Sequence, residues 1–145
     1  MFYSPEERGF SVQSTLIFSE DHELFREAVR EFVAHEITPH YPEWEQAHIM
    51  PRSVWQAAGE AGLLGLAVPE EFGGAHLPDY EYQLVLTQEL AIVGGYGFAL
   101  AVHLQQDLVL PYLLAYGTHE QKERWLPQMV SGDLVTSCAF TEPGA

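Results

Sequence analysis

The sequence predicts an all-α fold, a six-helix bundle of orthogonal, up-and-down-like packing that ends in one short strand or loop. Three observations support this prediction. Apolar residues recur at three- and four-residue steps through most of the chain, which is the period of one helix face. Glycine and proline separate these periodic segments. Only the last segment is short, uncharged and rich in residues that favour a strand.

The first predicted helix runs from about Ser19 to Glu36. Ser19 is a candidate N-cap, and the two acidic residues that follow it suit the positive end of a helix dipole. Pro39 is expected to stop this helix. A second, shorter helix begins near Pro51 and ends at Gly62. Glycine and proline then punctuate residues 62–78, which we expect to form a loop.

Four further helices are predicted in the second half of the chain. One begins at Asp79 and ends before Gly94-Gly95, where two residues without side chains can redirect the chain. Two short helices follow, at about 98–105 and 108–116, with Asp107 as a plausible cap for the second of them. The sixth helix opens at the capping box 118–121, bends or restarts at Pro127 and ends near residues 131–133.

The segment Leu134 to Thr141 is the predicted strand. Nothing earlier in the chain offers a convincing partner strand. A single strand cannot satisfy its own backbone donors and acceptors. We therefore expect its partners to come from another chain or from sequence beyond this one.

Composition and charge exclude several classes of function. The net charge is −15, and lysine and arginine form no cluster, so nucleic acid is not an expected partner. The single cysteine, Cys138, excludes an internal disulfide and suits a reducing compartment, so we expect a cytoplasmic protein. The uncharged stretch Leu90 to Gln106 is interrupted by glycines and polar residues, which favours a buried helix pair over a membrane span.

No catalytic or metal site follows from the residues alone. Gly95-Tyr96-Gly97 lacks the third glycine of a dinucleotide loop and follows a helix, so a turn is the better interpretation. His35 and His40 are five residues apart, which does not place them on one helix face for a metal. Ser137 and Cys138 lack the neighbours that activate a nucleophile.

Four motifs, taken together, point to a known family. In chain order they are Gly62-Leu63-Leu64-Gly65-Leu66-Ala67-Val68-Pro69-Glu70-Glu71-Phe72-Gly73-Gly74, Gly117-Thr118-His119-Glu120-Gln121-Lys122, Leu126-Pro127 with Ser131-Gly132-Asp133, and Cys138-Ala139-Phe140-Thr141-Glu142-Pro143-Gly144-Ala145. Their order and register, over about Leu16 to Ala145, resemble the acyl-CoA dehydrogenase family. The resemblance implies an N-terminal arm (1–18), the family's N-terminal helical domain (19–133) and the start of its flavin-binding middle β domain (134–145).

The resemblance also implies a chemistry. In this family an N-terminal helical domain, a central β domain and a C-terminal helical domain hold FAD and an acyl-CoA thioester, usually in a homotetramer, and an electron-transfer flavoprotein or a similar acceptor takes the electrons. A carboxylate base removes the proton alpha to the thioester carbonyl, while hydride leaves the beta carbon for flavin N5. The base belongs to the C-terminal domain. We therefore expect no catalytic residue in this chain, and no activity from the chain alone.

By the same resemblance, two groups of residues are candidate site residues. Cys138, Phe140 and Thr141 would lie against the flavin, with backbone amides and the threonine hydroxyl meeting its pyrimidine edge; many relatives differ at Cys138. The second group is Ala99, His103 and Asp107. They are spaced by four and would share one helix face, one that borders the acyl chain in relatives, if the fourth and fifth helices were continuous.

Alternatives stay open for this sequence. Core packing would explain Ala99 and helix capping would explain Asp107, while Tyr96 and Leu100 are equally possible pocket residues. A flavin-dependent oxidase or hydroxylase on the same scaffold would share every motif above. A different class of function is a non-catalytic helical module that binds a protein partner through an apolar surface.

Overall fold

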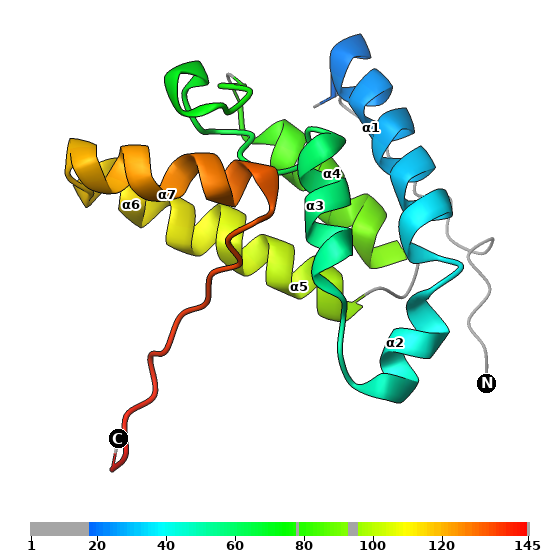
Figure 1. Cartoon of the computed structure of the whole chain (residues 1–145). Helices are drawn as coiled ribbons and strands as arrows, with labels where there is room; N and C mark the ends of the chain where they lie inside the picture. Colours follow the sequence, from blue (N-terminus) through cyan, green and yellow to red (C-terminus); the bar gives the residue numbers. More distant parts are fainter. Residues whose placement is uncertain (1–17, 78, 93–95, 145) are drawn as a thin grey trace, which may run out of the picture.

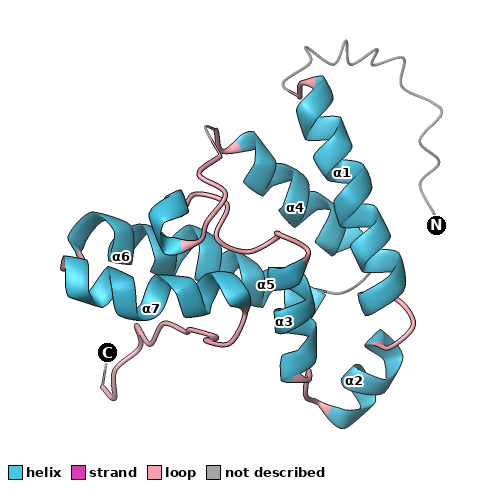
Figure 2. Ribbon diagram, turned by 45° about the horizontal axis from the view of Figure 1, so that its top comes forward, coloured by secondary structure: helices cyan, strands magenta, loops and turns pink. Residues whose placement is uncertain are grey.

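The computed structural model describes residues 18–77, 79–92 and 96–144. These residues form helices, turns and loops, without a strand, so the all-α prediction is confirmed (Figure 2). The proposed N-terminal arm, except Phe18, and the Gly94-Gly95 turn lie outside the described residues. The segment 134–141 is extended but forms no strand, because no neighbouring strand in the described part of the chain pairs with it.

The helical elements follow one another with short connections, apart from the loop over residues 61–80. In chain order they are α1 (Glu20–Phe32), the π-helical turn η2 (Val33–Ile37), α2 (Tyr41–Ala47), α3 (Arg52–Glu60), the 3₁₀ turn η3 (Glu70–Phe72), α4 (Glu81–Ile92), α5 (Tyr96–His103), the π-helical segment η4 (Leu104–Val109), α6 (Leu110–Tyr116) and α7 (His119–Ser131).

The helices differ from the prediction in two respects. Helix α2 was not predicted, because no side chain caps it and its sequence is too short for a clear period; Tyr41 and Trp44 hold it by packing against the main core. The predicted fourth and fifth helices are one continuous helix, since η4 joins α5 to α6. Pro111 lies inside this continuous helix, two residues after the π-helical segment η4.

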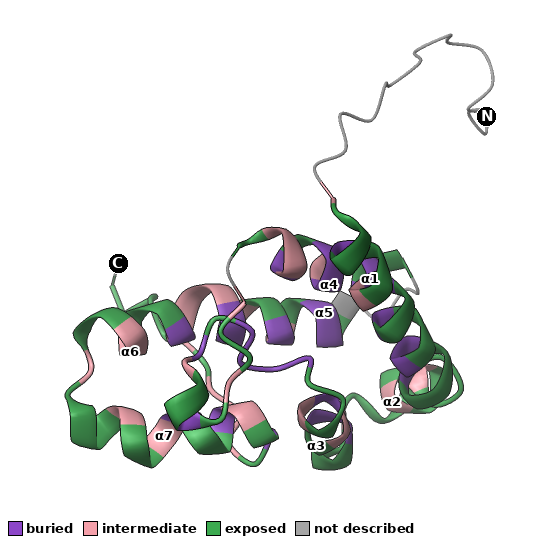
Figure 3. Ribbon diagram, turned by 90° about the horizontal axis from the view of Figure 1, so that it is seen from above, coloured by how far each residue is buried: buried purple, intermediate pink, exposed green. Residues whose placement is uncertain are grey.

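Two apolar clusters hold these helices together, and buried residues line their facing sides (Figure 3). The larger cluster lies among α1, α3, α4 and α5, with Trp55 and Phe98 in edge-to-face contact. The smaller one joins α6 and α7 to the η3 turn through Phe72, Leu126 and Met129. The two clusters are therefore at opposite ends of the long α5–α6 helix.

Helix α7 ends against the backbone of α3 at a glycine. Gly132 caps α7 with a φ of +79°, and a Cβ at this position would clash with the carbonyl group of Trp55. Only glycine combines a left-handed backbone with such a close approach at low cost. The C-terminal end of α7, and hence the direction of the segment that follows, is fixed by this contact.

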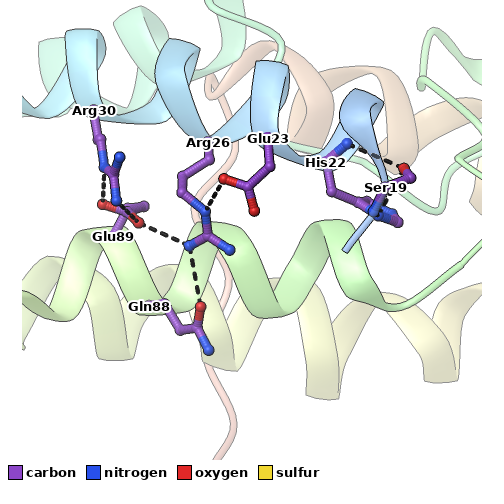
Figure 4. A network of polar contacts seen from close by, with 7 residues as sticks. All are labelled: Ser19, His22, Glu23, Arg26, Arg30, Gln88 and Glu89. Carbon is purple, nitrogen blue, oxygen red and sulfur yellow. Dashed lines mark hydrogen bonds and ion pairs between the residues drawn. The ribbon is translucent and has the colours of Figure 1, made fainter. Parts of the chain in front are cut away.

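A buried ion-pair network joins α1 to α4 (Figure 4). Glu89 is 4% exposed; Arg26 Nη1 donates to its Oε1 at 2.8 Å and Arg30 Nε donates to its Oε2 at 2.8 Å. Arg26 also donates to Glu23 and Gln88. Burial alone would raise the pKa of Glu89, but the bonds from Arg30 and Arg26 outweigh it and hold the pKa below its usual value.

The helix from Gly97 to Tyr116 is long and apolar enough to cross a membrane by length and composition. A third of the apolar window in this helix is buried inside the domain. The side chains of its two buried glutamines, Gln105 and Gln106, form hydrogen bonds with the backbone of the 61–80 loop, of α7 and of the segment after α7. These contacts attach one side of the helix to the rest of the domain.

Candidate functional site

The segment after α7 leaves the helical body as an extended arm (Figure 1). Hydrogen bonds hold the first part of the arm against the helical body. Leu134 N donates to Gln128 O at 2.9 Å. Thr136 donates from both N and Oγ1 to the side-chain oxygen of Gln105, at 2.9 and 3.2 Å. Gln105 is fully buried and also donates to Met129 O. One glutamine side chain therefore connects η4, the end of α7 and the start of the arm.

The three candidate flavin-contact residues all lie on this arm. Cys138 is half-buried, whereas Thr141 is exposed and Phe140 is 71% exposed. Within the described residues, the backbone N–H groups of 137–141 donate to no acceptor. The free backbone amides of this extended arm are hydrogen-bond donors of the kind that could meet the pyrimidine edge of a flavin.

The second candidate group does not line one surface. The helix is continuous, as that hypothesis required, but Ala99 is buried in the main core, where core packing explains it. His103 and Asp107 do meet, with Nδ1 and Oδ2 2.5 Å apart. Asp107 lies within η4 and caps no helix, so the capping alternative is wrong.

Asp107 lies beside a cavity of about 330 Å³ between α4, the 61–80 loop and the η4–α6 junction. Its polar side chains include Tyr80, Gln83 and Asp107, and its apolar side chains include Leu66, Leu77 and Pro111. The sequence did not single out Tyr80, Gln83 or Gln106. No motif marks a lone glutamine or tyrosine, and the fold alone brings residues 80 and 107 together.

Burial dominates the electrostatics of this cavity. It raises the pKa of Asp107, and the charge and contacts of His103, with the nearby Tyr80 hydroxyl and Gln83 amide, oppose the rise. Burial, followed by the charge of Asp107, also raises the pKa of Tyr80. The described residues contain no group of three or more His, Cys, Asp or Glu side chains that could hold a metal ion.

The two alternative pocket residues named from the sequence are Leu100 and Tyr96. Leu100 is exposed on the α5–α6 helix, and the side chain of Tyr96 lies outside what the structure describes. A separate apolar hollow, of about 540 Å³, lies between α6, α7 and the start of the arm, with Tyr112, Trp125 and Thr136 among its lining residues.

Known proteins share both the sequence and the fold of this chain. The family described as "Acyl-CoA dehydrogenase, N-terminal domain" matches residues 19–133. The long-chain specific acyl-CoA dehydrogenase of Mus musculus is 43% identical over 129 residues, which cover 89% of this chain and 29% of that protein. Isovaleryl-CoA dehydrogenase of Solanum tuberosum is 34% identical over 143 residues, covering 97% of this chain and 34% of that protein.

Among solved structures, an acyl-CoA dehydrogenase from Geobacillus kaustophilus superimposes with a TM-score of 0.83 and 44% identity, covering 89% of this chain and 33% of that one. An acyl-CoA dehydrogenase from Bacillus anthracis complexed with FAD gives a TM-score of 0.74 and 29% identity, covering 90% of this chain and 23% of that one. This chain spans about a third of the length of the curated relatives it matches. It belongs to the acyl-CoA dehydrogenase family and corresponds to the family's N-terminal domain.

Proposed function

We propose that this chain is the N-terminal helical part of an FAD-dependent acyl-CoA dehydrogenase, which introduces an α,β double bond into an acyl-CoA thioester. The observation that carries the proposal is the family match over residues 19–133, the helical body that positions the arm. Relatives support the cofactor: the Bacillus anthracis structure is a complex with FAD, and a glutaryl-CoA dehydrogenase from Mycobacterium smegmatis is a complex with FADH2.

In this proposal the arm belongs to the flavin site. FAD, when bound, accepts the hydride that leaves the beta carbon of the substrate. The free amides near Cys138 and Phe140 and the hydroxyl of Thr141 would donate hydrogen bonds to the flavin pyrimidine edge, where reduction concentrates negative charge. Gln105 would set the direction of the arm through its bonds to Thr136.

His103 and Asp107 are the remaining candidates for the acyl side of the site. Ala99 no longer supports this role, because its side chain packs into the core. The proposed division of the chain is an N-terminal arm (1–18), a helical domain (19–133) and the beginning of a β domain (134–145). The extended arm after α7 belongs to the last of these. The substrate-side base would lie outside this chain, so the chain alone is expected to be inactive.

The proposed partners are an acyl-CoA thioester, a second copy of the protein in a homo-oligomer, and an electron acceptor of the flavoprotein type. A structure described as an electron transferring flavoprotein of Acidaminococcus fermentans matches this chain with a TM-score of 0.80 and 30% identity, which supports the last of these. The cytoplasmic location stays a prediction; several curated relatives are named as mitochondrial.

A comparison of two proteins tests the proposal. The product of the intact reading frame that contains this sequence should be yellow and should reduce an artificial electron-accepting dye when an acyl-CoA thioester is added. The 145-residue chain, given free FAD and the same thioester, should reduce no dye. A colourless full product that folds cooperatively would contradict the dehydrogenase proposal and favour the protein-interaction module. Oxygen consumption without dye would favour an oxidase or hydroxylase.

A further inference from the structure

One side of helix α2 borders a hollow that the proposed flavin chemistry does not use. Helix α2 lies beside the first turn of α5 (Figure 1), where Gly97 N donates to the hydroxyl of Tyr41 at 3.4 Å. The hollow at this contact, called the α2 hollow below, has a volume of about 270 Å³. Tyr41, Trp44, Glu45 and His48 line it, and their spacing by three and four places them along one side of the helix and its C-cap.

Two aromatic rings of the α2 hollow stand nearly perpendicular to each other. The ring centroids of Tyr41 and Trp44 are 6.5 Å apart, and the ring planes are inclined by 73°. Both side chains are half-buried and pack against the main core. His40 stacks on the indole ring of Trp44 but does not line the hollow, so this contact supports the ring without filling the space. A cation in such a corner meets the negative π surface of two rings.

The charge beside these rings is negative. Glu45 is exposed, and in the described part of the chain it takes part in no ion pair. Contact with the Glu45 carboxylate is the main cause that raises the pKa of the Tyr41 hydroxyl, so the carboxylate lies next to the first ring. The described residues that line the hollow include no lysine or arginine. Two rings and an unpaired carboxylate together favour a positively charged ligand.

The remaining walls indicate which kind of cation fits. Met50 and Ile49 present apolar surface, and Ile49 is 70% exposed. A primary ammonium group carries three N–H donors that need acceptors, whereas the hydroxyl of Tyr41 already accepts from Gly97. A quaternary ammonium group has no N–H donor, and its methyl groups suit aromatic and apolar walls.

The size of the hollow agrees with a small ligand. A cavity of about 150 Å³ holds benzene, so 270 Å³ accommodates a trimethylammonium group with a short chain attached. We propose that the α2 hollow binds the quaternary ammonium group of a small molecule. This site is separate from the arm and from the cavity beside Asp107, and it does not depend on the dehydrogenase proposal.

Choline and 3,3-dimethyl-1-butanol test the role of charge, because they have nearly the same shape and only choline is charged. In the ¹⁵N-labelled 145-residue chain, choline should shift the indole N–H signal of Trp44 saturably, with an affinity at least about fivefold above that of the alcohol. The indole signals of Trp55 and Trp125, which do not line the hollow, should not follow this titration. Equal affinities, or equal shifts at all three tryptophans, would overturn the proposal.

The conditions separate a local site from general attraction to an acidic protein. The titration contains about 0.15 M NaCl, which screens charges more than about 8 Å away. It is run at pH 8, because a protonated His48 would repel the cation.

Two exposed glutamates of α2 provide a matched pair of variants. Glu45 lines the hollow and Glu43 does not. Glu45→Gln should lower the affinity for choline about threefold and leave that for the alcohol unchanged, whereas Glu43→Gln should change neither. An equal loss of choline affinity in both variants would show attraction to the net charge alone and would refute the site.

A second pair of variants tests the ring. Tyr41→Phe keeps the aromatic face, so the preference for choline over the alcohol should survive, whereas Tyr41→Leu should remove most of it. A preference that is intact in Tyr41→Leu would contradict the aromatic contact. If Tyr41→Leu does not fold, the two probes on the unmodified chain still decide.

A last comparison distinguishes a small molecule from a modified protein side chain that carries the same group. A short peptide with one trimethyllysine should bind no more than about tenfold tighter than choline if the hollow takes a small molecule. A peptide that binds much tighter than this would overturn the small-molecule assignment. These titrations need neither FAD nor turnover, so their outcome is independent of flavin activity.

Discussion

The substitution Glu89→Gln tests whether the buried network joins α1 to α4. Glu89 accepts from Arg26 Nη1 at 2.8 Å and from two nitrogens of Arg30, Nε and Nη2, at 2.8 and 3.1 Å. The new amide side chain would keep nearly the same volume, but it would carry no charge and would have one acceptor oxygen in place of two. The substitution therefore removes the electrostatic contribution and changes the packing little.

The expected magnitude comes from the buried arginine. A hydrogen bond to a charged group contributes about 1.5–3 kcal/mol, and Arg26, buried like its partner, would keep only Glu23, Gln88 and the single oxygen of the new amide. The side chain of Arg30 is 59% exposed, so water replaces its lost contacts and we assign it no share. The free energy of unfolding should fall by about 2 kcal/mol, which lowers the Tm of a domain of this size by roughly 8 °C.

Thermal and urea unfolding followed by circular dichroism measure this change. Glu23→Gln is the matched control, because Glu23 also accepts from Arg26 but its side chain is 55% exposed; its cost should stay below about 1 kcal/mol. If Glu89→Gln is no more destabilising than Glu23→Gln, the buried network does not hold the two helices together.

Four more predictions follow from the fold. The folded-state pKa of Glu89 is lowered, so the unfolded chain binds the proton first. The contribution of Glu89 to stability is therefore present above the ordinary glutamate pKa, about 4.3, and is lost as pH falls through the lower folded pKa. In urea titrations the stability gap between the unmodified chain and Glu89→Gln should shrink as pH is lowered below about 5, and a gap that does not change with pH would contradict this. Gly132→Ala should lower the free energy of unfolding by at least about 2 kcal/mol, because its Cβ would clash with the α3 backbone, whereas Gly62→Ala, with open space at a similar φ, should cost only about 1–2 kcal/mol; equal urea midpoints would contradict the clash. Thr118→Ala removes the capping box of α7 and should cost about 1 kcal/mol in thermal melts; an unchanged melt would mean that the cap contributes nothing. Gln105→Leu should release the start of the arm, so that the amide at position 136 exchanges with solvent at least about tenfold faster by NMR, and unchanged exchange would show that the arm is held otherwise.

The sequence was informative where the pattern is local. The capping residues Ser19 and Thr118 both accept the predicted backbone bonds, and both form full capping boxes. The box at Ser19 is completed by His22, which no capping-box pattern of Glu or Gln would have indicated. Local patterns succeed here because a cap depends only on residues within one turn.

The sequence failed where distant residues decide the structure. Helix α2 depends on Tyr41 and Trp44 packing on a core built by other segments, and η4 lets the long helix continue past the point where Asp107 suggested a cap. Spacing by four grouped Ala99 with His103 and Asp107, but packing against the core buries the first of them. Periodicity gives a face of a helix, and tertiary packing decides what that face meets.

The candidate site was predictable only in part, for the same reason. The motif around Thr141 marks the arm through residues that are consecutive in the chain. The cavity beside Asp107, in contrast, assembles Gln83 and Leu66 from separate elements, and no spacing in the sequence connects them.

The visible flavin spectrum of the protein translated from the intact reading frame around this sequence, recorded without oxygen before and after an acyl-CoA thioester is added, tests the dehydrogenase function most directly. We expect an oxidised flavin spectrum that is bleached by the thioester and not by free CoA. A purified, folded protein that carries no flavin, or a flavin that no acyl-CoA thioester reduces, would contradict it.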